Sequence, residues 1–191
     1  MSSLARLLSR ALPLLLVVAF MSPPVPAAAW AAPPSLDGES FTGTATFVTT
    51  GCTMLSTGTF DFSTAGTAVG AYPGPFDESG SVTIGTLGAV TGFDASFSVT
   101  AMSGPQNLYI ASGTKTLAPS PLGAGACLEG IGLNINSTYS AMITLPSGEK
   151  FCDTGTAVTN FGIPSAAGNF TETFSSNLTT ATPVGLSGTC P

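Results

Sequence analysis

Histidine is absent from the 191-residue chain, and arginine occurs only near the start, at Arg6 and Arg10. Without histidine, the chain cannot form a Ser-His-Asp or Cys-His nucleophilic site or a zinc site with histidine ligands. It also lacks the glycine loop ending in Gly-Lys-Ser/Thr that cradles phosphates. Because these common routes to catalysis are missing, we expect the protein not to be an enzyme and to need no cofactor.

Charge is scarce, since only 7% of the residues are charged. From residue 32 onward, Lys115 and Lys150 face ten acidic residues, which gives a net charge of 2 − 10 = −8. A domain with two cations and no arginine cannot neutralise a row of phosphates. We therefore expect no nucleic-acid partner, and contact with a membrane only during export.

The start of the chain has the layout of a secretory signal peptide. Two arginines precede an apolar run at residues 11–21, and small residues follow. The run is shorter than the ~20 apolar residues that a membrane-spanning helix needs. Ala29-Trp30-Ala31 fits the cleavage rule, and Ala27-Ala28-Ala29 is a second candidate. We expect residues 1–31 to be a signal peptide and residues 32–191 to be a single secreted, extracellular domain.

Four cysteines lie in the expected mature chain: Cys52, Cys127, Cys152 and Cys190. An even number in an exported chain predicts two disulfides, for which three connectivities are possible. We favour Cys127–Cys152 and Cys52–Cys190, because the second pair would tie the C-terminus to an early strand. The spacings are long and contain no Cys-x-x-Cys pair, so we expect no metal site at the cysteines.

The clearest pattern is an apolar residue at every second position, which is typical of β-strands. Tyr139, Ala141, Ile143 and Leu145 alternate in this way, and Pro146-Ser147-Gly148 then predicts the turn of a hairpin. Similar runs occur at 41–50, 57–63, 81–85, 90–101, 131–136 and 170–174.

Two further runs are less regular. Leu108 and Ile110 begin a strand toward Lys115 that Ser112-Gly113 is expected to interrupt. Phe170, Glu172 and Phe174 place an acid between two aromatic residues, which indicates a bulge, an edge position or a ligand-facing surface.

These strands predict an all-β domain, and no helical period is sustained after the leader. We expect an antiparallel β-sandwich of about eight to ten strands, with a closed up-and-down β-barrel as the alternative. Gly-Thr recurs at irregular intervals, from Gly43 to Gly188, which we attribute to composition rather than to a structural repeat.

The stretches AYPGPFDESGSVTIG and FDASFSV resemble those of uncharacterised secreted all-β proteins of actinobacteria. The resemblance covers about the middle half of the mature chain. It implies export and a β-fold, and it brings no activity and no site residue.

Carboxylates are the remaining candidates for chemistry. Asp61, Asp77-Glu78, Asp94 and Glu172 could supply the pair of carboxylates that a glycosidase needs. Asp77-Glu78 and Asp37-Gly38-Glu39 could contribute oxygen ligands to calcium, but solvated acidic turns are the simpler interpretation. Sugar sites also use aromatic platforms, for which Tyr72, Phe76, Tyr109 and Tyr139 are candidates, although core packing is more common. The sequons at Asn136, Asn169 and Asn177 are expected to be unmodified in a bacterial protein.

Three functions are compatible with these observations. The first is a non-catalytic extracellular or cell-surface interaction module that binds a protein or a glycan through loops at one end of the sheets. The second is a carrier of a small apolar ligand, held in a barrel or between two sheets. A secreted glycan-active hydrolase is the third.

Overall fold

The computed structural model describes residues 34–47, 57–102, 108–119, 124–128, 132–162, 168–177, 182–184, 188 and 190. All of them belong to the compact unit Ala32–Pro191. The expected signal peptide at 1–31 lies outside the described residues. In the described part of the chain, no helix is long and apolar enough to cross a membrane.

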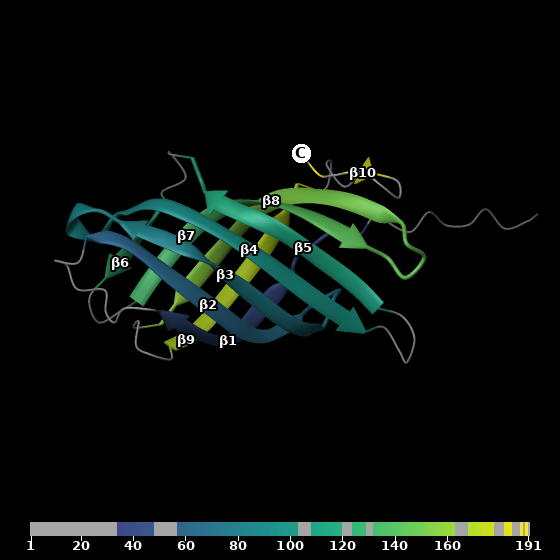
Figure 1. Ribbon diagram of the computed structural model, residues 1–191, viewed down its shortest axis with the longest axis horizontal. Coiled ribbons are helices and arrows are strands. Elements are labelled where there is room, and N and C mark those ends of the chain that lie inside the picture. Colours follow the sequence, from purple (N-terminus) through teal and green to yellow (C-terminus); the bar gives the residue numbers. More distant parts are fainter. Residues whose placement is uncertain are drawn as a thin grey trace, which may run out of the picture. The chain divides into compact units, whose positions relative to one another are not determined.

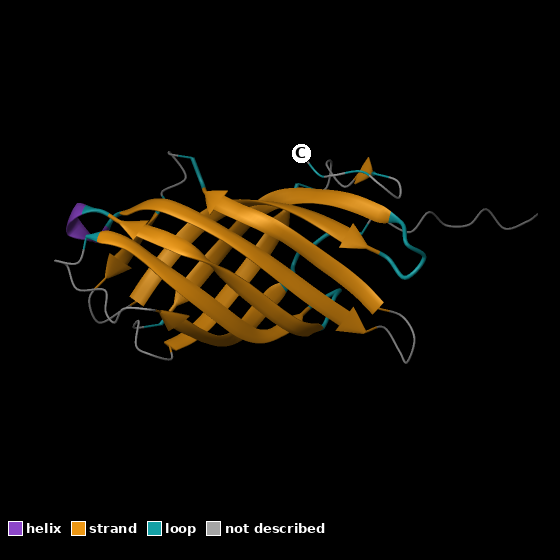
Figure 2. Ribbon diagram, viewed as in Figure 1, coloured by secondary structure: helices purple, strands orange, loops and turns teal. Residues whose placement is uncertain are grey.

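Strands make up nearly all of the regular structure, and the only helical element drawn is one short turn (Figure 2). The elements are β1 (Ser40–Phe47), β2 (Gly58–Val69), β3 (Gly74–Ile84), the 3-10 turn η1 (Thr86–Gly88), β4 (Val90–Met102), β5 (Leu108–Leu117), β6 (Gly125–Leu128), β7 (Gly132–Thr144), β8 (Lys150–Phe161), β9 (Gly168–Ser176) and β10 (Thr182–Pro183). The expected hairpin is confirmed, because β7 and β8 pair antiparallel from Leu133 with Phe161 to Thr144 with Lys150.

The strands close into an eight-stranded antiparallel barrel (Figure 1). The order around the wall is β1, β2, β3, β4, β5, β7, β8 and β9, and β9 then pairs with β1. The expectation of a sandwich is therefore wrong, and the barrel alternative is confirmed. Closure leaves no free edge between these strands, whereas each sheet of a sandwich has two.

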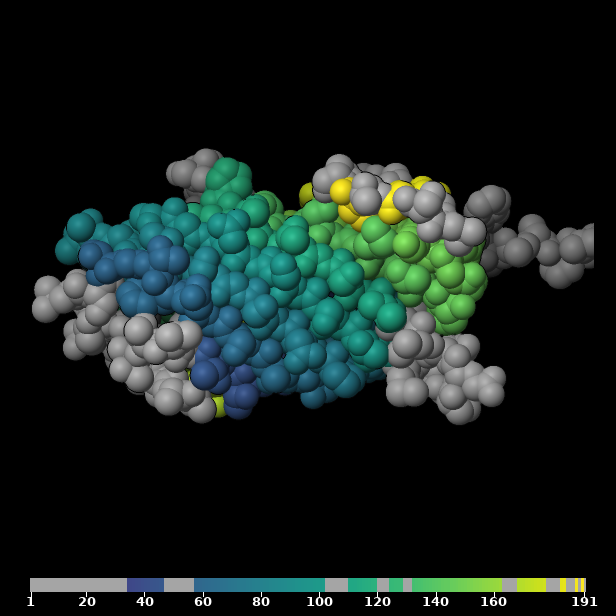
Figure 3. Space-filling model, in the orientation of Figure 1, coloured from purple at the N-terminus to yellow at the C-terminus, as the bar shows by residue number. Residues whose placement is uncertain are grey.

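Two short strands supplement the wall. β6 pairs with Gly132–Ile135 of β7, which lies beyond the segment of β7 that pairs with β5. An isolated bridge between Ala89 and Ala126 then joins β6 to the turn between β3 and β4. β10 pairs with the other end of β8, at Phe151 and Cys152. In the space-filling view, the yellow C-terminal atoms lie against the green surface that β7 and β8 share (Figure 3).

The alternating pattern of the sequence becomes an inside and an outside of the barrel. Tyr139, Ala141 and Ile143 are each at most 3% exposed, and Leu145 is partly buried against the same core. β5 runs unbroken through Ser112-Gly113, so the expected interruption is wrong. β9 pairs with a neighbour on both sides, so it is not an edge strand either.

Five glycines on the inward-facing rows lie directly opposite an aromatic residue on a paired strand. The pairs are Gly43 with Phe170, Gly66 with Phe76, Gly80 with Phe62, Gly113 with Phe97, and Gly155 with Tyr139. A Cβ at Gly155 would lie 2.8 Å from Tyr139 Cε1, which is closer than real contacts allow. At Gly155, glycine thus leaves room for the ring of Tyr139 and for the backbone of the neighbouring strand. The residue that follows each of the five glycines, threonine in four cases and Ser81 after Gly80, faces out.

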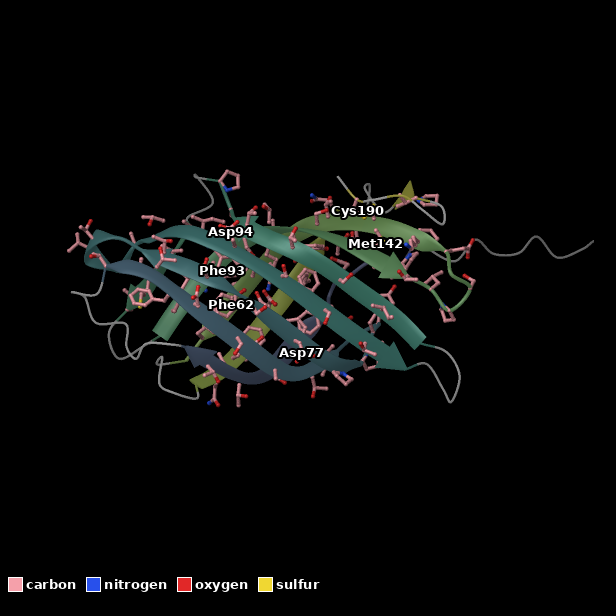
Figure 4. The ribbon with its side chains drawn as sticks, viewed as in Figure 1. Phe62, Asp77, Phe93, Asp94, Met142 and Cys190 are labelled. Atoms are coloured by element: carbon pink, nitrogen blue, oxygen red, sulfur yellow. A yellow bond between two sulfur atoms is a disulfide. The ribbon has the colours of Figure 1, made fainter. Side chains whose placement is uncertain are left out.

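The disulfides differ from the expected pairing. Cys152 bonds to Cys190, with 5.4 Å between their Cα atoms. The proposed Cys127–Cys152 and Cys52–Cys190 pairs are therefore wrong. Cys127 is also disulfide-bonded, and Cys52 lies outside the described residues. The physical reason is the register of β10, which lays the C-terminal segment along β8 beside Cys152. In Figure 4, Cys190 lies next to Met142, the partner of Cys152 on β7.

Candidate functional site

Aromatic rings pack against one another in the interior of the barrel. Phe41 stacks on Phe76 at 4.2 Å, and Phe76 stacks on Phe170 at 5.7 Å between ring centroids. Phe62 and Phe93 stack at 5.8 Å and lie close together in Figure 4. Such contacts add to the burial of apolar area that stabilises the fold.

Three charged side chains meet within this aromatic interior. Lys115 on β5 lies between Glu78 on β3 and Glu172 on β9, and its Nζ is 2.5 Å from Oε1 of each. All three side chains are 0% exposed. We call this group the buried triad. The sequence analysis named both glutamates, but it missed Lys115 because the expected strand break obscured which way that residue faces.

The two glutamates of the buried triad differ in their hydrogen bonds. Glu172 Oε1 accepts bonds from Lys115 Nζ and from Thr159 Oγ1, each at 2.5 Å. Neither oxygen of Glu78 accepts a well-aligned hydrogen bond. Burial, and then the charge of Glu172, raise the pKa of Glu78 to about 8, although Lys115 opposes this shift.

Rings surround the ammonium group of Lys115. Its Nζ lies 5.9 Å from the ring centroid of Phe93, 5.4 Å from that of Phe97 and 5.5 Å from that of Phe174. The faces of these rings attract a cation, but they cannot replace its hydration shell. The triad is therefore held in a dry environment, where charge separation is costly.

A second buried acid organises the N-terminal segment. Asp153 is 0% exposed and accepts hydrogen bonds from Leu36 N at 2.7 Å, Tyr139 Oη at 2.9 Å and Ser176 Oγ at 2.5 Å. Burial, and then the charge of Asp153, raise the pKa of Tyr139. Three donors satisfy this carboxylate, so its role is to anchor the segment before β1.

The acids of Asp37-Gly38-Glu39 also hold the segment before β1 in place. Asp37 accepts a hydrogen bond from Ser176 N at 3.0 Å, and the buried Glu39 accepts from Tyr72 N at 3.1 and 3.3 Å. Burial raises the pKa of Glu39, while the backbone N–H groups of Tyr72 and Ala71 lower it. Within the described ranges, no three cysteine, aspartate or glutamate side chains cluster in a way that could hold a metal ion.

The structure divides the carboxylates proposed for glycan hydrolysis into a buried pair and three exposed ones. Glu78 and Glu172 come together, but they are buried, so a sugar in solution cannot reach them. Asp61, Asp77 and Asp94 face out and are exposed, and Figure 4 labels Asp77 and Asp94 on β3 and β4. The proposed aromatic platforms Tyr72, Phe76 and Tyr139 are buried, with at most 7% exposure, and the side chain of Tyr109 lies outside the described residues.

A hollow of about 680 Å³ lies on the outer side of β6, β7, β8 and β9. We call it the asparagine groove. Its described lining is Ala124, Gly125, Ala126, Leu128, Gly132, Leu133, Asn134, Asn136, Asn160, Phe161, Gly162, Asn169 and Thr171. Asn134 pairs with Asn160 across β7 and β8, and Asn160 pairs with Thr171 across β8 and β9. This register places a polar row across three strands.

The described side chains that line the asparagine groove are uncharged. Its described lining contains four asparagines and one threonine but no charged side chain. Asn134 Nδ2 donates a hydrogen bond of 2.8 Å to Asn160 Oδ1, which fixes both amides relative to each other. The side-chain amide of asparagine has an NH2 group that donates hydrogen bonds and a carbonyl oxygen that accepts them. A row of amides can therefore bind a hydroxyl group either as its donor or as its acceptor. Leu128, which is 47% exposed, adds an apolar contact at the same hollow.

The sequence held a partial signal for the groove. Asn134 and Asn136 alternate with Leu133 and Ile135, so a period of two puts both asparagines on one face of the strand. The distant Asn160 and Asn169 join them only through the pairing of β7 with β8 and of β8 with β9. Comparison of the chain with protein-family models, curated proteins and solved structures finds no match.

Proposed function

We propose that the protein is a secreted, non-catalytic binding module that holds a glycan in the asparagine groove. The observation that carries the proposal is the uncharged, amide-lined hollow on the outer wall. A neutral ligand rich in hydroxyl groups matches it, because each hydroxyl both donates and accepts a hydrogen bond.

The packed interior also favours this function over the carrier. Stacked rings occupy the space in which an apolar ligand would sit. The described hollows over β2 to β5 and the neighbouring β7 are about 240, 400 and 590 Å³ and are lined largely by serine and threonine. The asparagine groove is larger and brings amides from three different strands together.

Sedimentation of the protein with insoluble chitin, cellulose and purified bacterial cell wall tests the proposal. We expect the wild type to bind at least one of the three solids and Asn160→Ala to bind it roughly tenfold more weakly, which corresponds to about 1.4 kcal/mol. Thr83→Val is the matched control, because Thr83 lies on β3 in the opposite wall. Its Oγ1 shares a hydrogen bond with Thr59 Oγ1, and its backbone carbonyl, which the substitution leaves in place, accepts one from Thr91 Oγ1.

Binding to none of the three solids would contradict the proposal. So would equal binding by wild type and Asn160→Ala, because the site would then lie elsewhere. Circular dichroism of each variant establishes that the barrel has folded before binding is compared.

A further inference from the structure

The buried triad brings an amine and a carboxyl group into reactive contact. Lys115 Nζ lies 2.5 Å from Glu78 Oε1, the same distance as from Glu172 Oε1. This contact lacks the alignment of a hydrogen bond, since both Glu78 oxygens are buried without a well-aligned donor. The ion pair therefore places the amine of Lys115 directly beside the carboxyl group of Glu78.

The second glutamate is arranged as a base. Glu172 Oε1 is 2.5 Å from the same Nζ and accepts a proper hydrogen bond from it. Thr159 Oγ1 donates to the same oxygen and holds the carboxylate in place. A carboxylate oriented by a hydroxyl and touching the nucleophile can accept its proton.

The raised pKa of Glu78 suits it to the role of electrophile, which leaves Glu172 as the base. Burial, and then the charge of Glu172, raise the pKa of Glu78, which favours its neutral, protonated form. A neutral carboxyl group is a better electrophile than a carboxylate, because it carries no charge to repel the incoming electron pair. Phe93, Phe97 and Phe174 keep the site dry, which destabilises the separated charges relative to a neutral product.

We propose that Lys115 and Glu78 form an intramolecular isopeptide bond, with Glu172 as the catalytic base. The bond joins Lys115 Nζ to Glu78 Cδ and ties β5 to β3 across the intervening β4. It requires only the three side chains already in contact.

The step balances without any further reactant. Glu172 takes one proton from the Lys115 ammonium, and the freed electron pair on Nζ attacks Cδ of the protonated Glu78. The C–OH bond breaks, and the hydroxyl leaves as water with a second proton from Nζ. The products are a neutral secondary amide, one water molecule and protonated Glu172, so the net charge of the triad is zero before and after.

The first test is the mass of the wild-type protein after denaturation and reduction. We expect it to be one water lighter than its amino-acid sequence requires. Trypsin gives an independent readout, because the chain from residue 32 onward has only two tryptic sites, after Lys115 and after Lys150. Trypsin requires a charged side chain, so we expect cleavage after Lys150 and none after Lys115. Fragment spectra should place the cross-link between Lys115 and Glu78.

Three variants test the assignments. Lys115→Met should have the full mass, and the control Lys150→Met should remain one water lighter. Glu172→Gln, which keeps the size of the side chain but removes the base, should also have its full mass. Glu172→Asp retains a carboxylate set back by one methylene, and we expect it to form the bond more slowly than the wild type.

A wild-type protein of full mass that trypsin cleaves after Lys115 would overturn the proposal. A bond from Lys115 to Glu172 would overturn the assignment of the two glutamates. Complete cross-linking in Glu172→Gln would remove Glu172 from its catalytic role. The wild-type measurement does not depend on whether any variant folds.

Discussion

At the scale of single residues, the barrel contains more buried acids than its low charge content implies. Glu39, Glu78, Asp153 and Glu172 are each at most 3% exposed. Glu39 and Asp153 accept hydrogen bonds, whereas Glu78 and Glu172 contact the ammonium group of Lys115. A buried carboxyl group whose pKa is raised makes stability depend on pH in a predictable direction.

Glu39 provides a test of this dependence. Its pKa lies above the usual 4.5 in the folded protein, so the folded state holds the proton longer than the unfolded chain does. Its contribution to stability is therefore complete below the unfolded pKa and is lost as pH rises through the folded pKa. As pH rises from about 4.5, we expect the unfolding free energy of wild type to fall relative to that of Glu39→Gln, by no more than about 1.4 kcal/mol per pH unit.

Urea unfolding of both proteins across that pH range measures the difference directly. Subtracting one curve from the other removes the titration of every other group, because the variant differs at one position only. A difference that is flat, or that rises with pH, would mean that Glu39 titrates at or below its usual value in the folded barrel.

At the scale of elements, small residues decide where the rings fit. Gly155 on β8 faces Tyr139 on β7, and an added Cβ would lie 2.8 Å from the ring. We expect Gly155→Ala to destabilise the protein by roughly 1–3 kcal/mol, because the neighbouring strand and ring must shift. The outward-facing Thr156→Ala serves as its control and should change stability by about 0.5 kcal/mol or less. Thermal and urea unfolding measure both, and equal effects would show that the interior can absorb the methyl group.

The disulfide between Cys152 and Cys190 holds the C-terminal segment against β8. It spans 38 residues of sequence, and a loop of that size constrains the unfolded chain by roughly 4 kcal/mol. We expect the double variant Cys152→Ala, Cys190→Ala to lose about 2–4 kcal/mol and to keep the barrel, since β8 still pairs with β7 and β9.

Hydrogen exchange of this variant separates the two effects. The amide of Val184, which donates to Lys150 O at 2.8 Å, should lose protection. The amides of β7 should keep theirs under native conditions. Loss of protection throughout β7 and β9 would mean that the disulfide is needed for the barrel itself.

At the scale of the whole molecule, closure is the property that distinguishes this protein from a sandwich. β1 pairs with both β2 and β9, so neither β1 nor β9 has a free edge along its paired residues. We expect amides of β1 and β9 to exchange as slowly as those of β3 and β4 in the wild type. Among the described residues, β10 pairs with β8 alone, and its single backbone amide, that of Thr182, should exchange faster. Rapid exchange confined to β1 and β9 would indicate that the barrel opens at this seam.

The sequence by itself determined the local structure. Its period of two predicted the strands, the hairpin of β7 and β8, and the inward rows of Tyr139, Ala141 and Ile143, because alternation depends only on the pleat of each strand. The absence of histidine excluded several kinds of site by chemistry alone. The Gly-Thr pairs that begin at Gly43, Gly66, Gly113 and Gly155 follow the inside and the outside of the barrel, although the irregular spacing of Gly-Thr along the chain concealed this.

Only the tertiary structure decided the closure, the disulfide and both candidate sites. Alternation is identical in an open and a closed sheet, so it could not separate a sandwich from a barrel. Lys115, Glu78 and Glu172 come from three strands that are not neighbours, and Asn134, Asn160 and Thr171 meet through pairing register. Such contacts depend on which strands pair and how far each is shifted, and these properties arise from the packing of the whole chain.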